Sequence, residues 1–278
     1  PDMKVVFTVS SMLEIHKGEA DLSRRAAIFH LPGLSFREFL ELEYKYKTES
    51  LSLADLLTHH VEVAMNIGRN LKPLVAFKDY LSFGYFPFYL EDRPLYHEKL
   101  LATLNTILDV DLPATERIDY YSIGRIKKLF AILSQLVPCI PNISVLSKEL
   151  GVTRISLLNY LFYLKKAQAL LLLDKETSGI KQLAKPEKIY LGNTNYAYAL
   201  GGDKTDIGNL RETFFFNQMR IKHAVSYSSK VDFMIDGKYS FETFSHRKSI
   251  VKSSGKFDIP LRYAPYGTLK YHILKRFL

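Results

Sequence analysis

The apolar and polar positions at the start of the chain predict two strands with a helix between them. An apolar run at residues 4–8 leads directly into Ser10 and Ser11, a polar stretch of helical character follows, and a second apolar run ends at residues 32–33. Apolar strands that alternate with a polar helix are typical of an α/β unit. We therefore expect residues 1–65 to contain the C-terminal part of an α/β core.

Helical spacing dominates the next part of the chain. Phe36, Phe39 and Leu40 fall on one helical face, and Ser35 with Glu38 three residues later has the spacing of an N-terminal capping box. Further helices are expected at residues 52–68, 73–84 and 94–113, with glycines and prolines between them. These helices predict a helical lid over residues 66–120.

The pattern after residue 120 predicts a winged helix-turn-helix at residues 121–184. An amphipathic helix stops at Pro138, and two further helices follow with Gly151 at the turn between them. The apolar run at residues 170–173 then has the character of the first strand of a wing hairpin.

A small α/β unit is expected at residues 185–242. Strands are predicted at residues 188–193 and 224–229, a helix at 208–223, and two more strands on either side of Asp236 and Gly237. Asp-Gly between short apolar strands favours a hairpin turn, because both central residues adopt positive φ there. The expected fold is mixed α/β, with four parts ahead of a divergent basic tail at residues 243–278.

The composition is that of a globular protein without a membrane anchor. Of the 278 residues, 47% are hydrophobic and 24% are charged, which excludes an intrinsically disordered chain. No apolar run approaches the roughly 20 residues that a membrane-spanning helix requires, and the first residues show no secretory signal. The single cysteine, Cys139, excludes an internal disulfide framework and fits a reducing compartment, so we expect a cytoplasmic protein.

The net charge of +9 is concentrated at the C-terminal end. Residues 243–278 contain eight Lys or Arg and one acidic residue, so they account for +7 and leave only +2 for residues 1–242. The main part of the chain is therefore almost neutral and lacks the overall basic character of many nucleic-acid-binding proteins. The tail is either a basic arm for nucleic acid or a membrane surface, or the product of a shift in reading frame.

The chain lacks the short motifs of phosphate and zinc sites. Neither G-x-x-x-x-G-K-[ST] nor H-E-x-x-H occurs, and no Cys/His pairs have ligand spacing. The segment at residues 170–176 imitates the apolar strand with an acidic end that orders Mg²⁺ in nucleotide hydrolases, but its place after the helix-turn-helix favours a wing strand. The residues alone therefore predict no cradle for a triphosphate.

An ordered series of segments nevertheless resembles bacterial AAA-superfamily ATPases that carry a C-terminal domain of unknown function. The segments are VVFTVSS, GEADLSRRA, LPGLSFREFL, GYFPFY, KPEKIYLGNTN, GNLRETFFFNQ and DFMIDGKYSFE. The resemblance implies that Ser10 and Ser11, preceded by Thr8, read the γ-phosphate and the attacking water as a sensor. Val9 replaces the glycine that the family has at this point.

The same resemblance gives Arg25, with Arg24 beside it, the role of an arginine finger that stabilises charge on the transferred phosphoryl group. The alternative is a solvated arginine in a structural ion pair. The family has its phosphate-binding loop and acidic Mg²⁺ strand ahead of this point, so we expect an N-terminally truncated fragment. ATP and Mg²⁺ then belong to the intact parent, and no cofactor is expected for the fragment.

Three carboxylates form a second candidate site. Glu212 on a helix, then Asp232 and Glu242 on successive strands, follow the order of the restriction-endonuclease-like fold, in which such acids hold Mg²⁺. The downstream domain of the ATPase family resembles that fold. Phe244 stands where the catalytic lysine would be, so the metal site is expected to be vestigial, with Mg²⁺-dependent nuclease activity as the third-ranked alternative.

The winged helix is the third candidate site. Thr153, Arg154, Ser156 and Asn159 would line its recognition helix and reach phosphates or base edges. That helix is also rich in Leu, Tyr and Phe, so DNA and a protein remain equal alternatives as its partner. The main functional hypothesis is a regulatory AAA-type ATPase fragment of undetermined oligomeric state, and its alternative is a winged-helix binding module without enzymatic activity.

Overall fold

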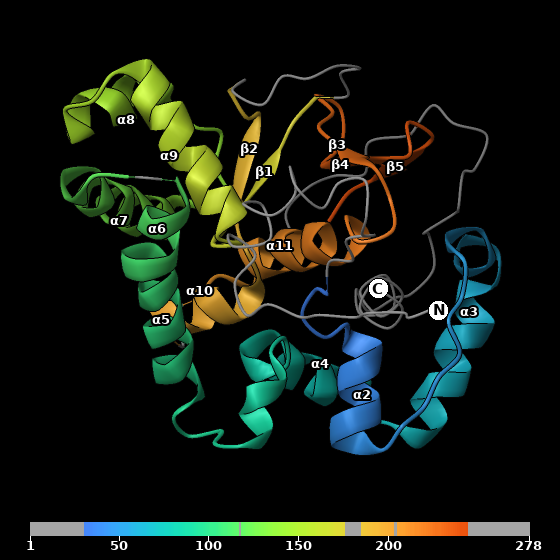
Figure 1. The fold of residues 1–278 in the computed structure, drawn as a ribbon. Helices are drawn as coiled ribbons and strands as arrows, with labels where there is room; N and C mark the ends of the chain where they lie inside the picture. Colours follow the sequence, from blue (N-terminus) through green and yellow to red (C-terminus); the bar gives the residue numbers. More distant parts are fainter. Residues whose placement is uncertain (1–30, 117, 176–184, 203–204, 244–278) are drawn as a thin grey trace, which may run out of the picture.

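The computed structural model describes residues 31–116, 118–175, 185–202 and 205–243. It shows a mixed α/β fold that is mostly helical, with two small antiparallel sheets among the helices (Figure 1). The mixed α/β class is thereby confirmed. The sensor and finger candidates and the basic tail lie outside the described residues: Thr8, Ser10, Ser11, Arg24, Arg25 and residues 244–278.

The first helices of the described ranges are α2 (Phe36–Tyr44), α3 (Leu53–Asn70) and α4 (Pro73–Phe83). The capping box expected at the start of α2 is present. The Ser35 hydroxyl accepts the Glu38 N–H at 3.2 Å, and the Glu38 carboxylate accepts the Ser35 N–H at 2.7 Å. These reciprocal bonds satisfy two backbone donors that a helix start leaves open, which is why the helix begins here.

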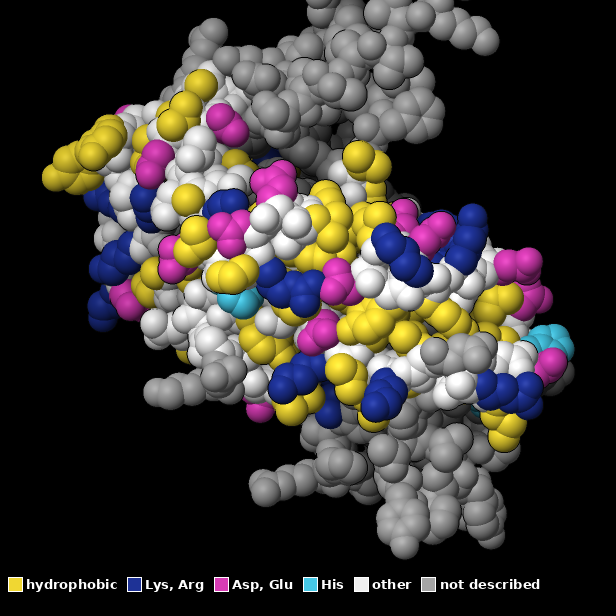
Figure 2. Space-filling view, turned by 90° about the horizontal axis from the view of Figure 1, so that it is seen from below, with side chains coloured by type: hydrophobic (Ala, Val, Ile, Leu, Met, Phe, Trp, Pro, Cys, Tyr) yellow, Lys and Arg dark blue, Asp and Glu magenta, His cyan; other side chains and the backbone are white. Residues whose placement is uncertain are grey.

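The face of the molecule seen in Figure 2 mixes apolar side chains with charges of both signs. Val75 on α4 and Met65 on α3 are among the exposed apolar residues of the described ranges. Apolar side chains scattered in this way occur on most folded proteins and need no partner. This face offers no continuous basic surface to a nucleic acid.

A long helical segment follows the 3₁₀ turn η1 (Pro87–Leu90). It consists of α5 (Tyr96–Thr106), the π-helical stretch η2 (Ile107–Asp111) and α6 (Leu112–Glu116). The helix expected at residues 94–113 is therefore present, but its hydrogen-bond pattern changes in the middle, which apolar spacing cannot reveal.

The helix-turn-helix follows as α7 (Tyr120–Leu136), α8 (Ile143–Leu150) and α9 (Arg154–Lys166). Gly151 ends α8 with φ of 61°, a conformation that costs glycine little because it has no Cβ. The backbone therefore reverses at the residue that the sequence indicated.

The strand after α9, β1 (Leu170–Leu173), pairs antiparallel with β2 (Lys188–Leu191). The register places Leu170 opposite Leu191 and Leu173 opposite Lys188. These two strands lie on opposite sides of the boundary expected between residues 184 and 185. The change in composition at that boundary falls in the connection between two paired strands.

The remaining described elements are α10 (Thr194–Gly201), α11 (Ile207–Met219), β3 (Val225–Ser226), β4 (Phe233–Ile235) and β5 (Tyr239–Phe241). The strands form a three-stranded antiparallel sheet in the order β3-β4-β5. Asp236 and Gly237 have φ of 53° and 62°, so the hairpin expected around them is confirmed. The strands are shorter than expected, and α11 ends at Met219 rather than at residue 223.

The β1–β2 hairpin lies between two hydrophobic cores. Leu170 and Ile189 belong to the larger core, which α2 and the helices from α4 to α10 build, whereas Leu171, Leu173 and Tyr190 belong to a smaller core with α11 and the β3-β4-β5 sheet. Successive side chains of a strand point to opposite faces. Both faces of this hairpin are therefore buried, so it forms an internal wall of the fold.

A buried asparagine joins α10 to the helices near the start of the described chain. The Asn195 side-chain oxygen accepts the Tyr85 N–H at 2.9 Å and the Tyr96 hydroxyl at 2.6 Å. Its nitrogen donates to the Leu81 carbonyl at 2.8 Å and the Tyr80 carbonyl at 3.0 Å. Asn195 thus caps the C-terminal end of α4 from more than a hundred residues away, in addition to the local bond from the Gly84 N–H to the Tyr80 carbonyl.

Candidate functional site

The strongest candidate site is the surface of the helix-turn-helix, and local hydrogen bonds fix its geometry. The Asn142 side chain accepts the Val145 N–H at the start of α8, and Thr153 accepts the Ser156 N–H at the start of α9. Both caps satisfy backbone donors that the helix leaves open. These caps therefore define where α8 begins before Gly151 and where α9 begins after it.

The four residues proposed for DNA contact play different roles in the structure. The Thr153 hydroxyl caps α9 and lies 3.0 Å from the Ser156 hydroxyl, so these two polar groups are occupied by each other and the backbone. Asn159 is half-buried, and Arg154 is exposed at the first position of the helix. Arg154 is the charged residue of the four, and it is exposed to solvent.

The two lysines at the end of α9 are paired with acids. Lys165 Nζ lies 4.0 Å from Asp174, and Lys166 Nζ lies 2.6 Å from Glu116 and 5.0 Å above the Phe162 ring. Burial raises the pKa of the Asp174 carboxyl, and the nearby Lys165 partly offsets that effect. These pairs lower the local positive charge that would attract a phosphate backbone.

Apolar side chains line the outer side of this unit. Ile155, at the start of α9, is 68% exposed, and Val145 on α8 is 55% exposed. Phe162, farther along α9, is half-buried. We call Arg154, Ile155 and Phe162 together the recognition surface. Ile155 thus places an exposed apolar side chain beside the exposed charge of Arg154 at the start of α9.

Two tyrosines that the sequence analysis did not single out lie at the adjacent start of α7. Tyr120 and Tyr121 are 89% and 79% exposed. The Tyr160 hydroxyl donates to the Ser122 hydroxyl at 3.1 Å, so α9 packs against this end of α7. Consecutive residues of a helix point about 100° apart, so two adjacent tyrosines at a helix start were a signal that at least one would be exposed.

The three carboxylates of the nuclease-like pattern are engaged in other bonds or do not converge. Glu212 accepts from Lys188 Nζ at 2.5 Å and from the Tyr190 hydroxyl at 3.1 Å. Asp232 accepts the N–H and the hydroxyl of Thr243 at 2.7 and 2.9 Å. Burial, Glu212 and Asp232 together raise the pKa of Tyr190, so the first two carboxylates lie near the same tyrosine.

No metal site results from this arrangement. Across residues 31–116, 118–175, 185–202 and 205–243, no group of three or more His, Cys, Asp or Glu side chains is placed to hold a metal ion, and that holds for Glu212, Asp232 and Glu242. The Lys188 ammonium supplies the positive charge beside Glu212. The sequence pattern missed this because Lys188 lies 24 residues before Glu212 and meets it only in the fold.

Two further features bear on the sequence-based expectations. Cys139 is half-buried, and burial raises the pKa of its thiol, so it is not an activated nucleophile. Within the part of the chain that the structure describes, none of the helices combines the length and apolar composition needed to cross a bilayer.

Comparison with models of protein families gives a match to the middle part of the chain. A family model described as "Domain of unknown function (DUF8612)" matches residues 74–206. That range begins in α4, includes the complete helix-turn-helix and the β1–β2 hairpin, and ends just before α11. One model thus runs through three of the parts that the sequence analysis separated.

Two curated proteins show similarity over part of their length. "Uncharacterized protein MJ1637" from Methanocaldococcus jannaschii is 26% identical over 189 residues, which is 66% of this chain and 40% of that protein. An aldehyde dehydrogenase from Craterostigma plantagineum is 43% identical over 42 residues, which is 15% of this chain and 9% of that protein. The chain therefore spans less than half the length of either relative. No solved structure matches.

Proposed function

We propose that this chain is the target-recognition part of an AAA-type ATPase, and that the recognition surface on α9 binds a protein partner. The ATPase part of the proposal rests on the series of segments that resembles that family. The binding part rests on the fold of residues 120–175 and 185–191.

The observation that carries the binding proposal is the order of elements around Gly151. Two short helices joined by a glycine turn are followed directly by an antiparallel hairpin, β1–β2. This order is that of a winged helix-turn-helix, whose second helix commonly contacts the target. The exposed start of α9 supports that role for Arg154 and Ile155.

Charge and burial favour a protein over DNA. A DNA-binding helix gains most of its affinity from several unpaired cations that meet phosphates. Here Lys165 and Lys166 are paired with acids, and Thr153 caps the helix with its hydroxyl 3.0 Å from that of Ser156. The hairpin faces are buried in the two cores.

The side chains that remain exposed fit a protein interface. Arginine and aromatic residues are enriched at the centres of protein–protein contacts. Arg154, the isoleucine beside it and the exposed pair Tyr120 and Tyr121 supply these types within one unit. A partner with an apolar side chain for Ile155 and an acidic group for Arg154 would complement this surface.

The other parts have defined roles in the proposal. Ser10, Ser11 and Arg25 serve the nucleotide site of the complete ATPase, with ATP and Mg²⁺ as its cofactors. The unit at residues 185–242 is proposed to be related to a nuclease-like fold because Glu212, Asp232 and Glu242 follow the order of its acids, and the Lys188–Glu212 ion pair then stands where a metal would otherwise bind. ATP turnover would then control access to the recognition surface.

The proposal is tested by site-specific photo-crosslinking in cells that contain the complete protein. A photoreactive phenylalanine analogue replaces Ile155, and, as a matched control, Val75, which is 56% exposed on α4. We expect a discrete protein adduct from position 155 that the control position does not give. Adding Arg154→Glu should reduce that adduct several-fold, because an interface charge is reversed.

Three other results would contradict the proposal. A crosslink from position 155 to DNA would reassign the recognition surface to nucleic acid. Identical adducts at positions 155 and 75 would remove the specific role of α9. Fluorescence anisotropy with labelled duplex supplies an independent measurement, and tight binding that falls steeply with added salt would contradict a protein target.

A further inference from the structure

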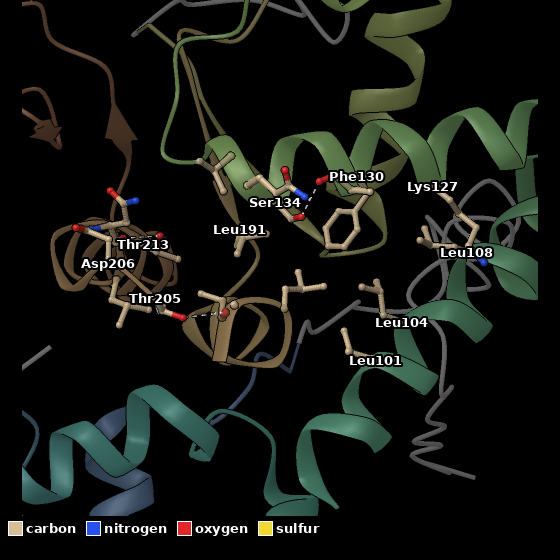
Figure 3. Close-up of a pocket in the computed structure, with 18 of the residues that line it drawn as sticks. Leu101, Leu104, Leu108, Lys127, Phe130, Ser134, Leu191, Thr205, Asp206 and Thr213 are labelled. Carbon is tan, nitrogen blue, oxygen red and sulfur yellow. Dashed lines mark hydrogen bonds between the residues drawn. The ribbon is translucent and has the colours of Figure 1, made fainter. Parts of the chain in front are cut away.

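A half-open cavity of about 800 Å³ lies between α5, η2, α7, α10 and the start of α11. Figure 3 shows Lys127 and Leu108 at one end of this space and Asp206 and Thr213 at the other. Its volume falls within the range of about 300–1,000 Å³ that is usual for small-molecule sites. The space is separate from the recognition surface and from the Lys188–Glu212 pair.

The floor of the cavity is apolar and fully formed. Leu104, Leu108, Phe130, Leu191 and Leu210 line it, and each is at most 6% exposed. Because Leu104, Leu108, Phe130 and Leu191 are also part of the larger core, the floor does not depend on a ligand to hold its shape. An apolar group lying here would be removed from water on one broad side.

Polar residues line the edges of the cavity, and their other bonds decide which of them could orient a ligand. Ser134 and Thr205 direct their hydroxyls to backbone carbonyls of neighbouring turns, at 2.9 and 3.2 Å, and so do not serve the cavity. Lys127 forms an ion pair with Asp109 at 2.9 Å. Lys128 is exposed and has no ion-pair or hydrogen-bond partner among the described residues.

The charge is therefore unequal along the cavity. Lys127 and Lys128 stand near the first end of its α7 wall, whereas the carboxylate of Asp206 stands at the far end. The lining along α7 runs from Lys127 to Val137, the residue that follows the helix, a length of about 15 Å at 1.5 Å per residue. With carbon–carbon bonds of about 1.5 Å, a zigzag chain of about twelve carbons has a similar length.

We infer that this cavity binds a single-chain carboxylate of the fatty-acid type. Its alkyl chain lies on the leucine floor and its carboxylate meets Lys128 at the basic end. The Asp206 end disfavours a second negative charge, which excludes dicarboxylic acids as good ligands. The Lys127–Asp109 pair contributes little net charge, so Lys128 gives the site its preference for an anion.

Calorimetric titration of the full 278-residue chain with dodecanoate, below its micelle concentration, tests the inference. We expect saturable binding at one site and a rise in the thermal unfolding midpoint, because a ligand that binds the folded state stabilises it. Decanoate should bind about tenfold more weakly, which corresponds to two methylenes at about 0.8 kcal/mol each, partly buried. Dodecylamine should bind more weakly than dodecanoate.

Two variants and one control locate the site. Ala131→Phe places a ring in the cavity from an exposed wall position and should abolish saturable binding, with far-ultraviolet circular dichroism unchanged. Lys128→Glu should weaken dodecanoate binding about three- to tenfold, as expected for a reversed exposed charge. The matched control, Lys148→Glu on α8, lies away from the cavity and should leave binding unchanged.

Several results would overturn the inference. These are absence of saturable binding, a lower unfolding midpoint with dodecanoate, or equal effects of the changes at Lys128 and Lys148. Undiminished binding by a folded Ala131→Phe variant would also refute this site. None of these outcomes bears on the protein crosslink at position 155, so the two proposals fail independently.

Discussion

Replacing Asn195 with leucine gives the most decisive test of how the fold is held together. Asn195 is 0% exposed and makes four hydrogen bonds: two to α4, one to Tyr85 and one to Tyr96 on α5. Leucine has the same number and branching of side-chain heavy atoms but no polar atoms and a somewhat larger volume, so the change removes hydrogen bonds and leaves no cavity. The loss in stability therefore reports the lost polar network together with any overpacking by the larger side chain.

The expected loss follows from the groups left without a partner. The Tyr85 N–H and the Leu81 carbonyl lose the bonds that cap the end of α4, and the Tyr96 hydroxyl loses its acceptor. The Tyr80 carbonyl keeps the Gly84 N–H at 2.9 Å. Each of the three orphaned groups costs about 1–3 kcal/mol, so we expect about 4 kcal/mol in total.

The assay is urea unfolding followed by far-ultraviolet circular dichroism. About 4 kcal/mol is a large part of the 5–15 kcal/mol that stabilises a typical domain, so the midpoint should fall strongly. Asn105→Leu, an exposed asparagine on α5, serves as the control and should change stability by about 0.5 kcal/mol or less.

A double variant separates the network from a general effect of leucine. Tyr96→Phe alone should cost about 1 kcal/mol, because it removes the bond to Asn195 and the long bond from the Phe86 N–H at 3.4 Å. Added to Asn195→Leu it removes the hydroxyl that has lost its acceptor, so it should cost clearly less there than it does alone. Strict additivity of the two changes would refute this reasoning, as would a loss below about 1 kcal/mol for Asn195→Leu.

Two further predictions concern the backbone and one ionisable pair. Gly192→Ala should strongly reduce the yield of folded protein in a solubility and circular dichroism assay, because an added Cβ would lie 1.8 Å from the Gln168 carbonyl oxygen; a folded variant of unchanged stability would contradict this contact. The hydrogen bond from His223 to Asp236, at 2.7 Å, and the Ala224 N–H lower the pKa of the Asp236 carboxyl below its usual value. A lowered folded pKa gives stability that is present above the unfolded pKa of about 3.9 and is lost as pH falls through the folded value. Asp236→Asn should therefore flatten the pH dependence of the thermal midpoint below about pH 4, and an unchanged slope in that range would show that this pair does not contribute.

The amino-acid sequence by itself determined the features that depend on neighbouring residues. The capping box at Ser35 and Glu38, the turn at Gly151 and the hairpin at Asp236 and Gly237 are all present as expected. Each depends on bonds or backbone angles within about four residues, where residue type alone decides the conformation.

The tertiary structure decided the features that join distant residues. Lys188 meets Glu212, the strand at residues 170–173 pairs with the one at 188–191, and Asn195 caps α4. The same is true of the cavity, whose lining comes from α5, α7, α10 and α11. Sequence spacing could order Glu212 and Asp232 along the chain, but it could not show which groups occupy them. Contacts between distant residues depend on how several helices and strands pack together around two cores, and local pattern carries no information about that packing.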